Sequence, residues 1–219
     1  MQRMCSAYSL VPGGGLPLAL TRRILLLMLL AAPGATGKPA EPIHGITRTE
    51  KLAFLLESLL LDKRVLRERF FGFQAYDYGP FSSEVYGDLE FFSQQSFIST
   101  EALLADPDGT VESESALKAM LDSMPQAGVD ADMLPPQAGS TEPLFALTEK
   151  GKRLVADKLQ PLMRSSPEAR DAFATAQRLK EAFGQIPLRQ LISYVYTQYP
   201  AFAEKSTIRE RVPEWKAPR

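Results

Sequence analysis

The stretch RRILLLMLLAAPGATGKPAEPIHGITRTEKLAFLLE, residues 22–57, decides which fold this chain adopts. Its first half has two arginines, an apolar run at 24–32 and several small residues, which is the pattern of a secretory signal. Its second half predicts a helix, because Thr47 and Glu50 form a capping box ahead of leucines at helical spacing. The apolar run is therefore either a signal that is removed near Gly37 or a helix of the core.

Length and composition indicate a soluble protein of ordinary domain size with a real core. The chain has 219 residues, of which 45% are hydrophobic and 23% are charged. The apolar run at 24–32 is too short to cross a bilayer, which requires about 20 apolar residues. We therefore expect no association with a membrane and a cytoplasmic location. Secretion through an N-terminal signal that ends near Gly37 stays open as the alternative.

Cysteine and histidine are scarce, and this excludes several classes of site. The single cysteine, Cys5, rules out an internal disulfide and a thiolate metal cluster. The single histidine, His44, has no second histidine for a zinc site, and no G-x-S-x-G motif surrounds any serine. No glycine-rich loop precedes a lysine-bearing helix start that could hold phosphate. We therefore predict no catalytic residues, no metal and no cofactor, and a protein that is not an enzyme.

Charge is distributed unevenly along the chain. Between Ala105 and Glu142 there are eight acids and one base, Lys118, a net charge of −7, whereas the other 24 bases and 18 acids give +6. This segment is also rich in proline and has no aromatic residue, so we expect a solvated insertion at 105–142. Within it, apolar residues at 117–124 have helical spacing and indicate either a short docked helix or a frayed turn.

Outside the insertion, most periodic segments predict helices. Ser82 is expected to cap a third helix, with Glu84 in its first turn and with Val85, Leu89 and Phe92 on its buried side. Two short strands are expected at 97–99 and 144–147, and Thr148 is expected to cap the helix at 149–159. Two further helices are expected, one through Phe173, Ala176, Leu179 and Phe183 and one from Leu188 to Tyr199.

The resulting order of elements is that of a winged helix. Three helices, counting the apolar run, are followed by two strands and another helix. The predicted fold is therefore mainly α with a small β-hairpin: a winged-helix-like core plus C-terminal helices. We expect a disordered leader at 1–19, one domain at 20–205 that carries the insertion, and a C-terminal tail at 206–219.

Five blocks of the sequence carry a resemblance to a known family: ILLLMLLAAPG, GITRTEKLAFLLE, FQAYDYGPFSSEVYGDLEFF, FALTEKGKRL and LRQLISYVYTQYP. Together they resemble the YwgA-like family and, more distantly, the phage-associated SocA-like or Panacea antitoxin domain. In that family the apolar helix and the helix after it belong to one domain. The resemblance thus implies that the run at 24–32 is core. The insertion and the leader are departures from the family pattern.

The resemblance and the local sequence together give a candidate partner-binding site: Arg48, Lys51, Tyr76, Tyr78, Gly79, Pro80 and Ser82. Each residue also has a structural interpretation. The two tyrosines can pin the loop before the third helix, and Gly79 and Pro80 can fix its turn. Arg48 and Lys51 can be solvated on a helix start, or they can form a basic contact with an acidic surface or a phosphate.

Two classes of function remain open. The resemblance implies a non-enzymatic protein-interaction module, which in an antitoxin-like form binds and occludes a protein partner such as a toxin. The alternative is a winged-helix DNA-binding transcriptional regulator. Nucleic acid is disfavoured, because the third helix carries Glu84, Asp88 and Glu90 but no lysine or arginine, whereas phosphate contacts need bases. The sequence does not indicate an oligomeric state.

Overall fold

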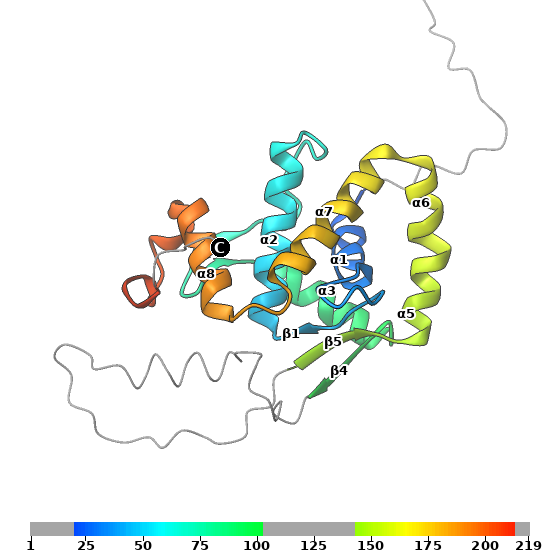
Figure 1. Ribbon diagram of the computed structural model, residues 1–219, viewed down its shortest axis with the longest axis horizontal. Coiled ribbons are helices and arrows are strands. Elements are labelled where there is room, and N and C mark those ends of the chain that lie inside the picture. The colour runs from blue at the N-terminus through cyan, green and yellow to red at the C-terminus, as the bar shows by residue number, and fades with distance from the viewer. Residues whose placement is uncertain (1–19, 103–142, 213–219) are drawn as a thin grey trace, which may run out of the picture.

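The computed structural model describes residues 20–102 and 143–212 (Figure 1). These residues form a mainly helical fold with a small antiparallel sheet, as the sequence predicted. The predicted leader at 1–19, the insertion at 105–142 and the helix or turn expected within it lie outside the described residues. In the described part of the chain, no helix is long and apolar enough to cross a membrane.

Helices dominate and the strands are short. In chain order the elements are α1 (Arg22–Ala31), β1 (Ile43–His44), α2 (Ile46–Asp62), β2 (Gln74–Tyr76), β3 (Gly79–Phe81), α3 (Ser83–Gln94), β4 (Ile98–Ala102), β5 (Pro143–Leu147), α5 (Glu149–Leu154), the π-helical η1 (Val155–Leu159), α6 (Gln160–Ser165), α7 (Pro167–Phe183), α8 (Leu188–Gln198), and the 3-10 turns η2 (Pro200–Ala203) and η3 (Arg209–Arg211). The helix predicted at 149–159 thus continues through η1 into α6, and α7 and α8 are the two predicted C-terminal helices.

The apolar run is a core helix, α1. Thr21 caps its start, since the hydroxyl accepts a hydrogen bond from the backbone N–H of Ile24. All side chains from Leu25 to Ala32 are buried, because α2, α3, α7, η1 and β5 pack around the helix. A helix that is apolar on every side requires such cover. The structure confirms that the run belongs to the core, so cleavage near Gly37 would remove a central element.

The central helix of the fold is α2, and its side chains are buried without a break from Thr47 to Ser58. In Figure 1, α7 crosses over α1 and α2, while α8 packs beside α2 on the side away from α5 and α6. The α7 helix begins at a Ser166 cap followed by Pro167, which favours a helix start.

Two of the three predicted helix caps are present. The Ser82 hydroxyl accepts a hydrogen bond from Val85 N–H at the start of α3, and Thr148 accepts one from Gly151 N–H at the start of α5. The predicted Thr47–Glu50 capping box is wrong. The chain leaves β1 and turns at Gly45, whose φ of 78° suits glycine, so α2 already begins at Ile46.

The sheet has one strand more than expected. The predicted hairpin forms, since β4 and β5 are antiparallel with Ile98 opposite Leu147. The β1 strand adds to the other edge of β5, with Ile43 opposite Phe145, and gives the order β1-β5-β4. A two-residue strand is too short to produce a periodic signal in the sequence. Together with α1, α2 and α3, this sheet forms the winged-helix-like core (Figure 1).

A second hairpin was not predicted. Strands β2 and β3 pair antiparallel, with Gln74 opposite Phe81 and Tyr76 opposite Gly79. They lie in the segment between α2 and α3, where the sequence predicts a loop with a turn. Each strand has only three residues, so alternation of polar and apolar side chains could not identify them.

Candidate functional site

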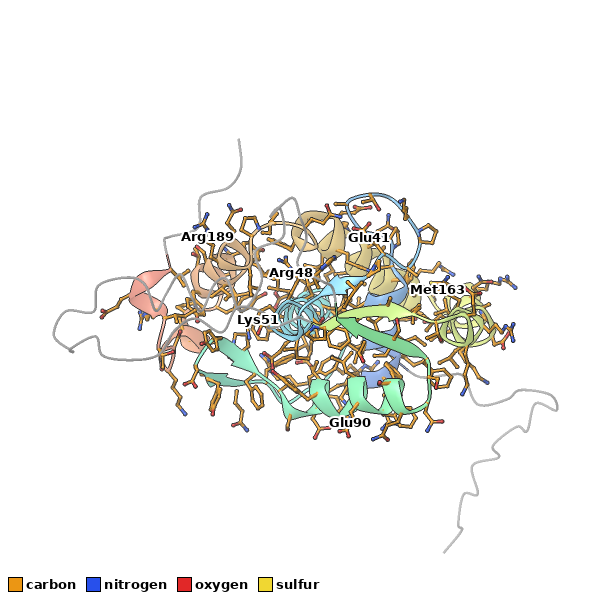
Figure 2. All side chains as sticks on the ribbon, turned by 90° about the horizontal axis from the view of Figure 1, so that it is seen from below. Glu41, Arg48, Lys51, Glu90, Met163 and Arg189 are labelled. Atoms are coloured by element: carbon orange, nitrogen blue, oxygen red, sulfur yellow. The ribbon has the colours of Figure 1, made fainter. Side chains whose placement is uncertain are left out.

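The two basic residues of the predicted site lie inside the molecule. Arg48 and Lys51 are buried on α2, so the interpretation that they are solvated is wrong (Figure 2). An Arg48 guanidinium nitrogen, Nη1, donates to the carbonyl oxygen of Phe183 at the end of α7 (2.8 Å). Lys51 Nζ donates to Glu50 Oε2 (2.8 Å) and to the carbonyl oxygen of Pro80 in β3 (2.9 Å). In this structure both side chains therefore hold other parts of the chain against α2.

Glu50 extends the same buried network to the start of α3. Its Oε1 atom accepts a hydrogen bond from Ser82 N–H (2.9 Å). Ser82 is itself buried, and its hydroxyl donates to the carbonyl oxygen of Phe71 (2.6 Å). The pair of Glu50 and Lys51 thus fixes β3 and the cap of α3 to the central helix. Because both charges are buried, their mutual contact and their hydrogen bonds must offset a large desolvation cost.

The tip of the second hairpin is attached to α8 and to the chain after it. Gly79 has a φ of 91°, and an added Cβ atom would lie 2.8 Å from Cε1 of Tyr196. The carbonyl oxygen of Asp77 accepts hydrogen bonds from the Ser206 hydroxyl (2.9 Å) and from Thr207 N–H (3.1 Å). The Ser206 and Tyr196 hydroxyls share a hydrogen bond of 2.5 Å. Burial raises the pKa of Tyr196 to about 12.

Packing continues beyond the predicted end of the domain at 205. Ile208 is buried and belongs to the hydrophobic core. Its backbone N–H donates to the Ser206 hydroxyl (3.2 Å), the same group that contacts the hairpin. The first residues of the predicted tail at 206–219 therefore take part in holding the hairpin.

Three aromatic side chains of the second hairpin and α3 form a row at the surface, in which Tyr76 and Tyr86 are exposed and Phe81 is half-buried. Tyr76 is 55% exposed and Tyr86 is 40% exposed, and these are the exposed large hydrophobic residues of the described chain. Phe81 lies between them, with ring centroids 5.2 Å from Tyr76 and 5.5 Å from Tyr86. We call Tyr76, Phe81 and Tyr86 the aromatic strip. Its members come from β2, β3 and the first turns of α3.

The structure separates the predicted site residues into two groups. Tyr76 is in the aromatic strip, whereas Tyr78 is half-buried and packs against the core. Lys51, Pro80 and Ser82 belong to the buried network that holds β3 and the start of α3. Gly79 packs at the hairpin turn against Tyr196, and Arg48 bonds instead to the end of α7. Sequence analysis missed Phe81 and Tyr86. The sequence does show that Tyr86 is not among the residues on the buried side of the third helix, but not that it lies beside Tyr76.

The stretch of chain that carries the strip is acidic. From 74 to 95 the chain has four acids, Asp77, Glu84, Asp88 and Glu90, and no lysine or arginine. Two arginines reach α3 from the start of α1. Arg22 and Arg23 each bond the buried Asp88 carboxylate, at 2.6 Å and 2.8 Å, and Arg22 also contacts Glu84.

A second buried polar cluster joins α7 to the end of α1. Lys180 is buried, and its Nζ atom donates to the carbonyl oxygens of Ala32 (2.7 Å) and Leu30 (3.2 Å). Burial lowers the pKa of Lys180 to about 7, although the charge of Glu41 opposes this. Burial alone would raise the pKa of Glu41, but hydrogen bonds from Thr36 and from the Gln185 amide outweigh it, and the pKa is lowered. Sequence analysis did not identify this cluster.

No protein-family model matches this chain, and no curated protein matches it. The resemblance to YwgA-like proteins and to the SocA-like or Panacea antitoxin domain stays a prediction. The function must therefore be inferred from the arrangement of the side chains.

Proposed function

We propose that this protein is a non-enzymatic protein-interaction module that binds and occludes a protein partner through the aromatic strip, in the manner of an antitoxin. The exposure of Tyr76 and Tyr86 on one continuous row with Phe81 carries this proposal. Other aromatic rings, such as Phe54 and Phe71, are buried in the core. The block of sequence that resembles the antitoxin domain, FQAYDYGPFSSEVYGDLEFF, supplies all three residues of the strip.

The strip has the composition and the rigidity of a binding surface. Tyrosine is enriched among the residues that contribute most to protein interfaces, because it buries a large ring and still has a polar end. The hydrogen bonds from Ser206 to Asp77 and from Lys51 to Pro80 hold the hairpin in place before a partner binds. A surface that is ordered in advance loses less conformational entropy on binding.

The charge of α3 favours a protein partner over duplex DNA. In a winged helix this element is in the position to enter a major groove, where it would meet phosphates. Glu84 and Glu90 are exposed on α3, and Arg22 and Arg23 are engaged by Asp88. Most of the affinity for DNA comes from lysine and arginine side chains that neutralise phosphates and release counterions. The α3 helix contains no lysine or arginine.

The test is co-purification from the cells that make the protein, with three forms of the full-length chain. The first is wild type, the second carries Tyr76→Ser and Tyr86→Ser, and the third carries Arg178→Ser and Glu181→Ser at exposed positions of α7. We expect a protein that is retained by wild type and by the α7 variant but lost by the tyrosine variant. Equal retention by all three forms would contradict the proposed site.

A parallel selection with genomic DNA fragments at physiological salt distinguishes the DNA-binding alternative. Specific regulators bind their sites with a Kd of about 10⁻⁸ M or tighter under such conditions. We expect no enriched sequence. One enriched site with that affinity would show that the protein is a transcriptional regulator and would contradict the interaction-module proposal.

A further inference from the structure

We propose that the occupant of the aromatic strip is a cationic segment of the partner protein, with a lysine or arginine that lies between the Tyr86 ring and the Glu90 carboxylate. This inference rests on the proposed function and adds the chemistry of the partner. It follows from the charges around the strip and from their positions on α3.

The two margins of α3 differ in charge. Glu84 and Asp88 are four residues apart, so they share one margin, and there Arg22 and Arg23 offset their charges. Tyr86 and Glu90 are likewise four residues apart and share the margin that carries the strip. That margin therefore combines an exposed aromatic ring with an acid one turn away.

Glu90 is available to a partner. It is exposed, and Figure 2 shows it on the outer side of α3, away from Arg48 and Lys51. Among the described residues it takes part in no ion pair, and its Oε1 atom accepts a hydrogen bond from the Gln94 amide (3.1 Å). An incoming ammonium or guanidinium group would thus gain a carboxylate partner without breaking an existing salt bridge.

The surface beside Tyr86 leaves room for the approach of a side chain. Gly87 is exposed, and apart from its two chain neighbours and the backbone of its own helix, nothing lies within 4 Å of the position where its Cβ would be. A long lysine or arginine side chain can therefore run along α3 from the ring to the acid. A cation above an aromatic face is attracted by the ring, and a nearby carboxylate adds to this attraction. Acidic segments and phosphates are disfavoured, because Glu90 lies on the margin of Tyr86 and residues 74–95 contain no lysine or arginine.

The experiment uses a displayed library of random short peptides, selected on the immobilised full-length chain at physiological salt. The tightest peptide is synthesised and titrated against wild type and single variants. We expect enriched sequences with a lysine or arginine next to an apolar residue. Glu90→Lys should lower the affinity of such a peptide about fivefold, which is the upper end for losing one surface ion pair and is expected here because the new lysine also repels the cation. Tyr86→Ala should abolish its binding.

Glu181→Lys is the matched control for Glu90→Lys. Glu181 is exposed on α7 and accepts a hydrogen bond from the Gln177 amide four residues earlier (2.8 Å), so it reproduces a Gln–Glu pair on a helix surface without an aromatic strip. Its substitution should leave the peptide affinity unchanged. The melting temperature of each variant shows whether the fold is intact, and Glu90→Gln separates loss of charge from reversal of charge.

The outcomes distinguish the inference from the proposed function. Neutral or acidic peptides that need Tyr86 but tolerate Glu90→Lys would overturn the cationic occupant and leave the strip as the binding site. Peptides that still bind after Tyr76→Ala and Tyr86→Ala, or no enrichment at all, would overturn both.

Discussion

Replacing Lys51 with methionine tests whether the buried Glu50–Lys51 pair holds the second hairpin and α3 in place. The substitution removes the donor to Glu50 Oε2 (2.8 Å) and to the carbonyl oxygen of Pro80 (2.9 Å). The Glu50 carboxylate then stays buried without its countercharge, with Ser82 N–H still donating to it. Removing one partner of a buried ion pair costs about 3–5 kcal/mol. We expect the free energy of unfolding of Lys51→Met to fall by about that amount.

A second substitution should recover part of this loss. Glu50→Gln in the Lys51→Met background removes the buried charge and keeps a carbonyl oxygen for Ser82 N–H. The remaining cost is mainly the unsatisfied carbonyl oxygen of Pro80, about 1–3 kcal/mol. The double variant should therefore be more stable than Lys51→Met alone.

The assay is urea unfolding followed by circular dichroism for wild type, both single variants and the double variant. The control pair is Glu149→Gln with Lys152→Met, because these exposed residues of α5 form the same type of ion pair at 2.7 Å. Substituting the control pair should produce no measurable change, since solvent screens exposed charges. A double variant no more stable than Lys51→Met alone would refute the reasoning. The buried Glu50 charge would then not be the cause of the lower free energy of unfolding.

Three further predictions follow from the packing. Deletion of 1–32 should abolish cooperative thermal unfolding, because it removes α1 from the core; a soluble product with native-like helical content would contradict this. The free energy of unfolding should rise with pH between about 7 and 10.5, because over this range Lys180 is protonated in the unfolded chain but largely neutral in the folded one. Below pH 7 Lys180 is protonated in both the folded and the unfolded chain, so its contribution is constant there. Lys180→Met should remove the rise. If the difference in stability between wild type and Lys180→Met did not change from pH 7 to 10, this prediction would be contradicted. Ser206→Ala should increase hydrogen exchange of the amides at 74–81, because Asp77 loses a donor, whereas Ser165→Ala, which removes a hydroxyl bonded to helix carbonyls, should not. Equal exchange in the two variants would show that Ser206 does not hold the hairpin.

Local chemistry is what made the helices predictable. The α3 helix has its cap, its first-turn acid and its buried residues within eleven positions, 82–92, so the sequence contains every part of the signal. The apolar run of α1 is equally local, and the resemblance to a family in which it is core decided between two interpretations. The Thr47–Glu50 capping box failed because β1 pairs with a strand about a hundred residues later, and the chain then turns at Gly45 so that the helix already begins at Ile46.

The candidate site was predictable only in part, because most of its contacts join distant segments. Lys51 donates to the carbonyl oxygen of Pro80, and Arg48 donates to that of Phe183. No local sequence pattern predicts that a charged side chain will be buried against a backbone oxygen. Tyr76 was identified from its unusual sequence context. Phe81 and Tyr86 join it only through the β2–β3 register and the direction of α3, which the sequence does not reveal.

Chemical nitration of tyrosine, read by mass spectrometry, tests most directly whether the aromatic strip is the binding surface. The chain is labelled alone and in complex with the protein that co-purifies with it. Tyr76 and Tyr86 should react readily in the isolated chain and become protected in the complex, while the half-buried Tyr194, which packs on Phe183, should react equally in both. Unchanged nitration of Tyr76 and Tyr86 in the complex would show that the partner binds elsewhere and would contradict the proposed function.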